Sequence, residues 1–392
     1  MRPATRSSLP GCGPCENAKA VRNYSSIASI LKTVQLACKV NCRCRPVSRG
    51  QVTLQCITGQ RKRALVEAID THTHFVPRSF PAATGRNPLW PSVELRGGDG
   101  AAAVMVGGKV FRVIDSRSWD ANRRIDDMAA DDVDVHVVSP MPELLSHWFP
   151  ADDADDLGRH INEGIAALGT AQPGRFIGIG MVPMQDARLA VKRLDELKSL
   201  GLRGFEIGTH INGVALGDER LHEVYAAAEQ ANLAILVHPL HPAGLDRMGG
   251  RPELAAVAAF PLETALAAVS LMTHGVMERF PDLRIMLSHG GGALPWILPR
   301  LKHARGIGAP LDSLFARDPA EIVRAFYFDT ILYDQPALEF LANKVGRDRI
   351  VVGSDYPFTI KQDRPGEFAE RSLAMPRRDL TANARRWLGL EA

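Results

Sequence analysis

The stretch Arg284-Ile-Met-Leu-Ser-His-Gly-Gly-Gly292 joins an apolar run to a histidine and three glycines. Ile285, Met286 and Leu287 form an uninterrupted apolar segment, which is typical of a parallel strand buried on both faces. The segment stops at His289, and the glycines after it allow the backbone to approach whatever the imidazole faces. One such stretch is weak support for a site, because a histidine at a strand end is more often structural.

The same design recurs in three other apolar runs of the chain. They are Ala68–His74, which carries His72 and His74; Leu233–Pro239, which carries His238; and Ile350–Pro357, which carries Asp355. Four predicted strands therefore each deliver a metal-type ligand or an acid/base group at the carboxyl end. A scaffold that brings these four ends together would build one site.

Strand-like and helix-like patterns alternate from residue 64 onward. The predicted strands are 64–70, 133–139, 175–182, 203–207, 233–238, 284–288, 325–330 and 349–354. The predicted helices are 122–131, 152–171, 186–200, 218–231, 260–279, 293–305, 335–345, 365–374 and 381–389. Eight strands that alternate with helices predict an α/β fold, a parallel (β/α)8 TIM barrel. A doubly wound open sheet is the alternative; the absence of Gly-x-Gly-x-x-Gly after the first strand disfavours it.

A long insertion, residues 75–122, separates the first strand from the second. It contains short β-prone runs at 93–96, 102–106 and 109–113, with glycine-rich turns between them. This pattern predicts a small antiparallel β-ribbon inserted after strand one.

The N-terminal residues differ in composition from the rest of the chain. Residues 1–66 hold 12 Lys and Arg and one acid, whereas the remainder holds 35 basic and 43 acidic residues, a net charge of −8. All six cysteines lie at or before Cys56. We interpret residues 1–63 as a basic, cysteine-bearing extension without a packed fold, and residues 64–392 as one domain. The Arg- and Ser-rich composition of residues 1–63 resembles an organelle transit peptide. Without such a peptide, we expect a cytoplasmic protein.

Charge and hydropathy also exclude classes of partner. The acidic main body disfavours binding to nucleic acid. The most apolar stretch, 254–272, contains Pro261 and Glu263, so we expect no membrane span.

The strand-end residues have the chemistry of a metal site. His72 and His74 are two residues apart, so their side chains point to one face of the strand. Neutral imidazoles suit a borderline divalent cation such as Zn²⁺, and a carboxylate adds charge. His72, His74, His238 and Asp355 are four ligand candidates, which leaves His289 as an acid/base group beside the metal.

Taken together, several motifs resemble the amidohydrolase superfamily, and within it the aminocarboxymuconate-semialdehyde decarboxylase family. They are Ile69-Asp70-Thr71-His72-Thr73-His74, Val237-His238-Pro239, Leu287-Ser288-His289-Gly290-Gly291-Gly292 and Val352-Gly353-Ser354-Asp355-Tyr356-Pro357-Phe358. Two further segments, Gly107–Arg112 in the insertion and Trp119–Met128, which begins in the insertion and runs beyond it, resemble the substrate side of that family. The resemblance covers about residues 66–392.

The resemblance implies one divalent metal, most often zinc, with manganese or cobalt as alternatives. It implies that His72, His74, His238 and Asp355 hold the metal, and that His289 and Asp355 are catalytic. It also implies that Arg124 contacts a substrate carboxylate, and that Arg300 is contributed across a homodimer interface. Lys109 and Phe358 are further candidates for substrate binding.

Two departures from related patterns bear on the reaction. Strand four ends without the lysine that bridges two metals in binuclear relatives, so one metal is expected. His-Pro is followed by Leu240-His241 where the family tends to carry tryptophan, which leaves the substrate open. His241 is either a polar substrate contact or a loop histidine.

We therefore expect a metal-dependent, non-oxidative decarboxylase of an unsaturated or aromatic carboxylic acid. The alternative is a metal-dependent hydrolase or hydratase that acts on a related lactone, amide or unsaturated acid. A metal-binding protein without catalysis is a third class, which the additional His289 disfavours.

Overall fold

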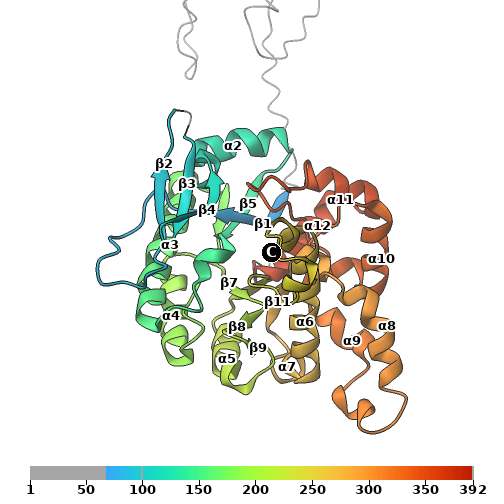
Figure 1. Ribbon diagram of the computed structural model, residues 1–392. Coiled ribbons are helices and arrows are strands. Elements are labelled where there is room, and N and C mark those ends of the chain that lie inside the picture. Colours follow the sequence, from blue (N-terminus) through green and yellow to red (C-terminus); the bar gives the residue numbers. More distant parts are fainter. Residues whose placement is uncertain (1–67, 99, 391–392) are drawn as a thin grey trace, which may run out of the picture. The chain divides into compact units, whose positions relative to one another are not determined.

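The computed structural model describes residues 68–98 and 100–390. The predicted N-terminal extension, residues 1–63, lies outside the described residues. Within the described part, parallel strands lie at the centre and helices surround them (Figure 1).

The parallel strands form two hydrogen-bonded sheets. The first has the order β1 (Ile69–Phe75), β5 (Val135–Pro140) and β6 (Phe176–Gly178). The second has the order β12 (Tyr327–Phe328), β11 (Arg284–Leu287), β10 (Ala234–His238) and β7 (Gly204–Gly208). Isolated parallel bridges join Gly180 to Phe205, Phe328 to Ile350, and Thr73 to Tyr356.

Helices follow the strands in the predicted alternation. They are α2 (Ala121–Ala130), α3 (Ala151–Ala171), α4 (Ala187–Ser199), α5 (His222–Gln230), α6 (Phe260–Thr273), α7 (Val276–Arg279), α8 (Leu294–Ala304), α9 (Pro319–Ile322), α10 (Gln335–Val345), α11 (Pro365–Leu373) and α12 (Arg377–Trp387). Several begin at an aspartate whose carboxylate accepts first-turn backbone N–H groups: Asp120 for α2, Asp186 for α4 and Asp334 for α10. Such caps fix where the helix starts and contribute roughly 1 kcal/mol each.

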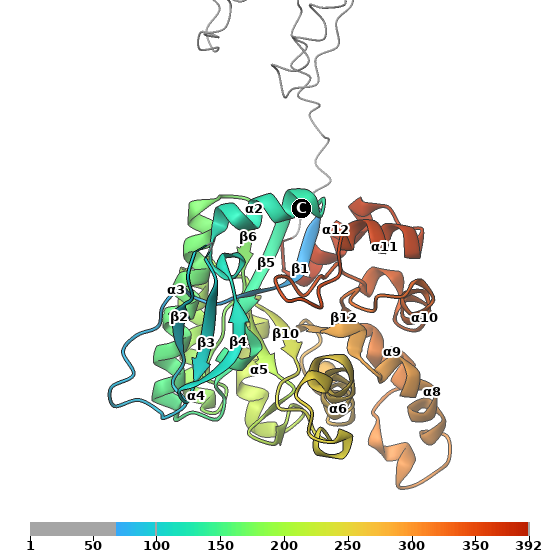
Figure 2. The same ribbon diagram turned by 45° about the horizontal axis from the view of Figure 1, so that its top comes forward.

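A separate antiparallel sheet follows β1. It consists of β2 (Ser92–Leu95), β3 (Ala102–Val106) and β4 (Lys109–Ile114), with β3 in the middle. Figure 2 shows this sheet at the side of the molecule where α3 lies. Val104 of β3 is fully buried against the main core, so one face of the sheet packs inward.

The first strand differs from its predicted position. The described strand begins at Ile69 and extends to Phe75, so both histidines lie inside β1 and not after it. Every residue of β1 is buried, and several of them are polar. The strand therefore lacks the continuous apolar run from which strand bounds were predicted. The pairing with β5 shifts between Asp70 and Thr73, which marks an irregularity next to His72.

The predicted strand at 349–354 forms no regular ladder. Val351 donates its backbone N–H to Phe328, and Val352 accepts one from Thr71, so the segment still lies between β12 and β1. The predicted helix at 260–279 is interrupted at Gly275, which has a positive φ of 66° and separates α6 from α7.

The apolar run near α6 is helical through Pro261, so this proline does not interrupt it. Proline is tolerated there because it occupies the first turn of α6. Among the described residues, Ala255–Thr273 is the one helical run long and apolar enough to span a bilayer. Core helices pass the same test, and Glu263 within this run is buried and accepts the Ala243 N–H at 2.8 Å.

Candidate metal centre

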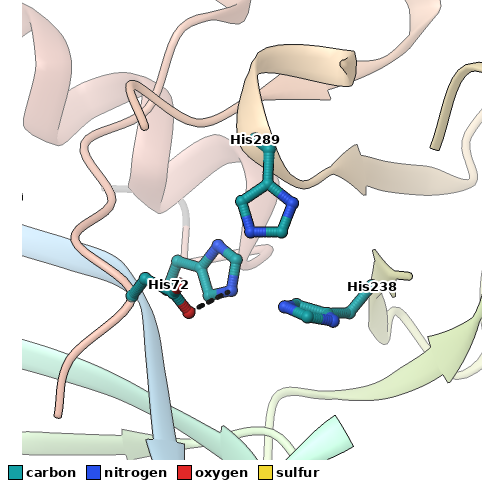
Figure 3. A group of neighbouring side chains, drawn as sticks. His72, His238 and His289 are labelled. Atoms are coloured by element: carbon teal, nitrogen blue, oxygen red, sulfur yellow. Dashed lines mark ion pairs between the residues drawn. The ribbon is translucent and has the colours of Figure 1, made fainter. Parts of the chain in front are cut away.

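Four histidines, from two strands and from the turn after a third strand, converge at one point. His72 and His74 come from β1, His238 from β10, and His289 follows β11. The ring centroids of His72, His74 and His238 are 4.9, 5.0 and 5.1 Å apart, and that of His289 is 5.0 Å from His238. Figure 3 shows His72, His238 and His289 pointing toward one another.

Hydrogen bonds at the outer ring nitrogens fix which nitrogen of each histidine faces the centre. The Nδ1 atom of His74 lies 2.9 Å from the Pro140 carbonyl, and that of His238 lies 2.9 Å from the Pro239 carbonyl. A carbonyl oxygen only accepts, so both Nδ1 atoms carry the proton and both Nε2 atoms present a lone pair. The Nε2 atom of His238 is buried and has no hydrogen-bond partner within the described residues.

The inner nitrogen atoms lie at distances that suit ligands of one cation. The Nε2 atoms of His72 and His74 are 3.0 Å apart, and Oδ1 of Asp355 is 3.1 Å from Nε2 of His74. His74 and His238 can offer only lone pairs toward this point, so a bound cation is the partner that satisfies them. His72, His238, His289 and Asp355 also offer ligand atoms within 4.8 Å of one another. The residues therefore fit one divalent metal, with five donor side chains around it.

Buried carboxylates make the centre favour positive charge. Burial lowers the pKa of His72, but the hydrogen bond to Asp329 and the charges of Asp329, Asp355 and Glu206 outweigh it and raise that pKa to about 9. Burial lowers the pKa of His74 to about 4, so this ring stays neutral. Burial also raises the pKa of Glu206 to about 8.

Asp329 supports this centre and was not predicted from the sequence. Its Oδ2 atom lies 2.7 Å from Nδ1 of His72, and its carboxylate accepts the backbone N–H groups of His289, Gly290 and Ile331 at 2.9 to 3.1 Å. It thus orients one ligand and holds the turn that presents His289, whose φ is +54°. The sequence feature that could have identified Asp329 is its position directly after Phe328, near the end of the predicted strand 325–330.

Replacing Asp329 by alanine is expected to weaken both metal binding and activity by about 10- to 100-fold, the usual scale for losing an outer partner of a ligating histidine. A competition titration with a chelator measures the metal affinity. Asp334→Ala, which removes only the cap of α10, is the matched control and should leave that affinity unchanged.

The glycines after His289 have a different role from the one expected. A side chain at Gly292 would lie 1.8 Å from the Pro261 carbonyl oxygen, and one at Gly291 would meet the Phe328 ring at 2.7 Å. The glycines therefore mainly allow the backbone after His289 to lie close to α6 and β12. Gly292 also lines the cavity described next.

A cavity of about 940 Å³ opens above the metal centre. His238, His289 and Asp355 lie on its wall, together with Phe358, which stacks on His74 at 4.9 Å between centroids. Arg112 of β4 also faces this cavity, with its guanidinium 4.3 Å from the Phe358 ring centroid. Burial lowers the pKa of Arg112, and the Asp355 and Glu143 carboxylates oppose that shift. Arg112 is thus a partly buried cation placed to receive an anionic substrate group.

The structure does not bring Arg124, Arg300 and Lys109 into this cavity. Arg124 is fully buried behind β1, where it donates to the His74 carbonyl and lies 5.1 Å from the Tyr356 ring, so its predicted contact with substrate was wrong. Lys109 is exposed on the β3–β4 hairpin, and Arg300 is exposed on α8. Of the predicted substrate contacts, the structure brings Phe358 to the cavity.

Comparisons with known proteins bear on this arrangement. A family model described as "Amidohydrolase" matches residues 69–390. A protein of Dictyostelium discoideum named 2-amino-3-carboxymuconate-6-semialdehyde decarboxylase is 33% identical over 342 residues, which cover 82% of this chain and 92% of that protein.

Two solved structures are similar to the whole described domain or most of it. That of 5-carboxyvanillate decarboxylase from Sphingomonas paucimobilis has a TM-score of 0.68 at 24% identity, and the match covers 83% of this chain and 100% of that one. A second 5-carboxyvanillate decarboxylase, from Novosphingobium aromaticivorans, carries bound manganese; its TM-score is 0.62 at 25% identity, over 70% of this chain and 83% of that one. These likenesses imply a TIM-barrel fold of mixed α/β class.

Proposed function

This chain belongs to the amidohydrolase family, in its aminocarboxymuconate-semialdehyde decarboxylase-like branch, and on that premise we propose how it works. It is a metal-dependent, non-oxidative decarboxylase of an unsaturated or aromatic carboxylic acid. The observation that carries this function is the joint position of the His/Asp centre and Arg112 on one cavity. A carboxylic acid held by Arg112 would have its reacting carbon beside that centre.

His72, His74, His238 and Asp355 would hold the metal, which we propose to be zinc. Three imidazoles and one carboxylate are the donor set that suits this borderline cation. When bound, the metal would supply Lewis-acid polarisation next to the substrate.

The chain's own side chains would bind the acid and move the proton. Decarboxylation without an oxidant needs a proton on the carbon that loses the carboxylate, so that the electron pair of the C–C bond has an acceptor when CO2 leaves. His289 lines the cavity, and burial lowers its pKa while Asp355 and Asp329 oppose that shift. His289 and Asp355 are placed to hold and pass that proton. Phe358 and other apolar residues make up much of the cavity wall.

CO2 release tests the proposed function directly. The metal-loaded protein would be screened with carboxylated catechols, muconates and related acids, with CO2 measured as the product. Uptake of water without loss of CO2 would instead support the hydrolase or hydratase alternative.

Arg112→Leu is expected to lower kcat/KM by about 10- to 100-fold, mainly through KM, because one hydrogen-bonded charge contact to the acid is lost. Steady-state kinetics on the best acid from the screen measures the change. Lys109→Leu, three residues earlier on β4 and outside the cavity, is the matched control. Equal effects of the two substitutions would contradict the assignment of Arg112.

We further propose that the eight strand segments close into a (β/α)8 barrel, with the sheet β2–β4 as an insertion after strand one. The three isolated bridges support this proposal. They lie between β6 and β7, between β12 and the segment 350–356, and between that segment and β1.

A homodimer is proposed from the exposed apolar surface of α6 and α8, two helices that pack together. Leu262 and Leu266 of α6 are exposed, and Trp296 of α8 is 78% exposed. A second copy of this chain is the proposed occupant, because a surface patch of this kind is rarely left open to water. Arg300 lies four residues after Trp296, on the same face of α8, so pairing would carry its charge to the partner.

Trp296→Glu is expected to convert the dimer into a monomer, because a charge would be buried at the centre of the apolar contact. Light scattering on the purified protein gives the mass. Leu311→Glu alters another exposed apolar residue, on the segment between α8 and α9, and serves as the control. A monomeric wild type would contradict the proposal.

A further inference from the structure

A pair of polar side chains on the cavity wall has no part in the function described so far. Glu143 lies in the 3-10 turn Pro142–Leu145 after β5, and His241 lies in the loop after β10. Both line the same cavity as the metal centre. Nε2 of His241 is 3.4 Å from Oε1 of Glu143.

The loop holds His241 in place from three sides. Its ring packs against Trp148 at a tilt of 48°, with 4.3 Å between centroids, and its carbonyl lies 3.4 Å from Nε2 of His210. The buried Glu263 accepts the N–H of Ala243, two residues later, at 2.8 Å. The φ of His241 is +47°, a conformation that the surrounding contacts must maintain. These contacts fix the imidazole against the Glu143 carboxylate.

Glu143 is largely shielded from water. Its side chain is 17% exposed, whereas that of His241 is 47% exposed. A carboxylate accepts several hydrogen bonds, so contact with His241 leaves acceptor positions free toward the cavity. Two cations on this wall are committed differently: Lys361 pairs with Asp131 at 3.0 Å and with Asp363, and Arg112 is suited to the substrate carboxylate.

The charge of Glu143 limits what can lie beside it. A second carboxylate of the substrate would be repelled there, whereas an O–H or N–H would be bound strongly, because hydrogen bonds to a charged acceptor are about twice as strong as neutral ones. A hydroxyl or amino group conjugated with the reacting carbon also lends electron density to it. Protonation of that carbon then becomes easier, and the O–H or N–H becomes a better donor.

We infer that Glu143 is a specificity-determining residue that accepts a hydrogen bond from a hydroxyl or amino substituent of the acid, and that His241 positions it. The inference rests on the proposed function, since it names the substrate class of the same site. Acids with such a donor are preferred over analogues in which the donor is methylated.

Calorimetry with simple acids tests this without turnover. The probes are the three isomers of hydroxybenzoate and of aminobenzoate, each compared with its methoxy or dimethylamino analogue, on the metal-loaded protein. The wild type should bind at least one donor-bearing isomer about tenfold more tightly than its analogue, the lower scale for a hydrogen bond to a charged group. Glu143→Leu should abolish this preference, and Glu143→Gln, whose amide oxygen still accepts, should keep part of it.

Matched variants separate recognition from general damage to the cavity. Glu253 is a second carboxylate on the same cavity, on an exposed residue, so Glu253→Leu should keep the wild-type preference. His241→Ala should reduce the preference while affinity for the methylated analogues stays constant. Unchanged metal content and melting temperature in each variant exclude misfolding.

Three results would overturn the inference: no benzoate binds, the wild type shows no preference, or Glu143→Leu retains it. The results that contradict this inference differ from those that contradict the proposed function. A Glu143-dependent preference without CO2 release from any acid would contradict the decarboxylase and leave the substrate class standing. CO2 release without the preference would support the decarboxylase and contradict the inferred substrate class.

Discussion

Replacing His238 by alanine is expected to remove the metal and the activity together. The Nε2 atom of His238 is buried and unpaired among the described residues, and its Nδ1 proton is committed to the Pro239 carbonyl. Burial and the neighbouring histidines hold its pKa well below the ordinary value, so the ring is a neutral ligand. Without it, the centre loses one of the three imidazoles of the proposed ligand set.

Elemental analysis after dialysis, alongside CO2 release, measures this outcome. The wild type should retain about one divalent metal per chain, as a mononuclear site requires. His238→Ala should retain almost none and release CO2 at the background rate. His210→Ala, which alters another histidine at the carboxyl end of a neighbouring strand, is the control and should keep the metal. Retention of the metal by His238→Ala would contradict the assigned ligand set.

The sequence was sufficient to predict the centre because buried parallel strands leave a simple signal. Strand β10 is an apolar run that ends at the buried His238, and the apolar residues Ile285–Leu287 of β11 are followed two positions later by His289. His238 and His289 stand out for that reason. The same logic located Asp355, although its segment forms no regular ladder, because Ile350–Val352 is apolar and buried.

Asp329 escaped prediction for a related reason. The ladder of β12 is only two residues long, and Asp329 follows Phe328 directly. Its significance depends on contacts with His72 and His289, which are distant in the sequence. No local pattern encodes such a contact.

The choice between two arginines also needed the structure. Arg112 and Arg124 both lie in segments that resemble the substrate side of the family. Arg124 is on the buried face of α2 and is used by the His74 carbonyl, whereas Arg112 leaves β4 toward the cavity. The direction of each side chain decides between them, and for Arg112 that direction depends on how the sheet β2–β4 packs.

His289→Ala is expected to leave the metal in place and to reduce turnover by roughly 10² to 10⁴, the usual scale for losing a general acid/base. The backbone of His289 is held by Asp329, so removing the ring should not disturb the turn. The proposed ligands His72, His74, His238 and Asp355 remain. The ring also lines the cavity next to the position of the substrate, where a proton must be delivered.

Comparison with His74→Ala tests whether His289 is an acid/base group or a metal ligand. His289 and His74 are the two alternatives for the last ligand position, because both lie near His72, His238 and Asp355. If His74 is the ligand, His74→Ala loses the metal and His289→Ala keeps it; the reverse pattern would exchange their roles. Free imidazole added to His289→Ala should restore part of the turnover, because the deleted ring leaves space in an open cavity. Such rescue would not occur if the ring only supported the fold.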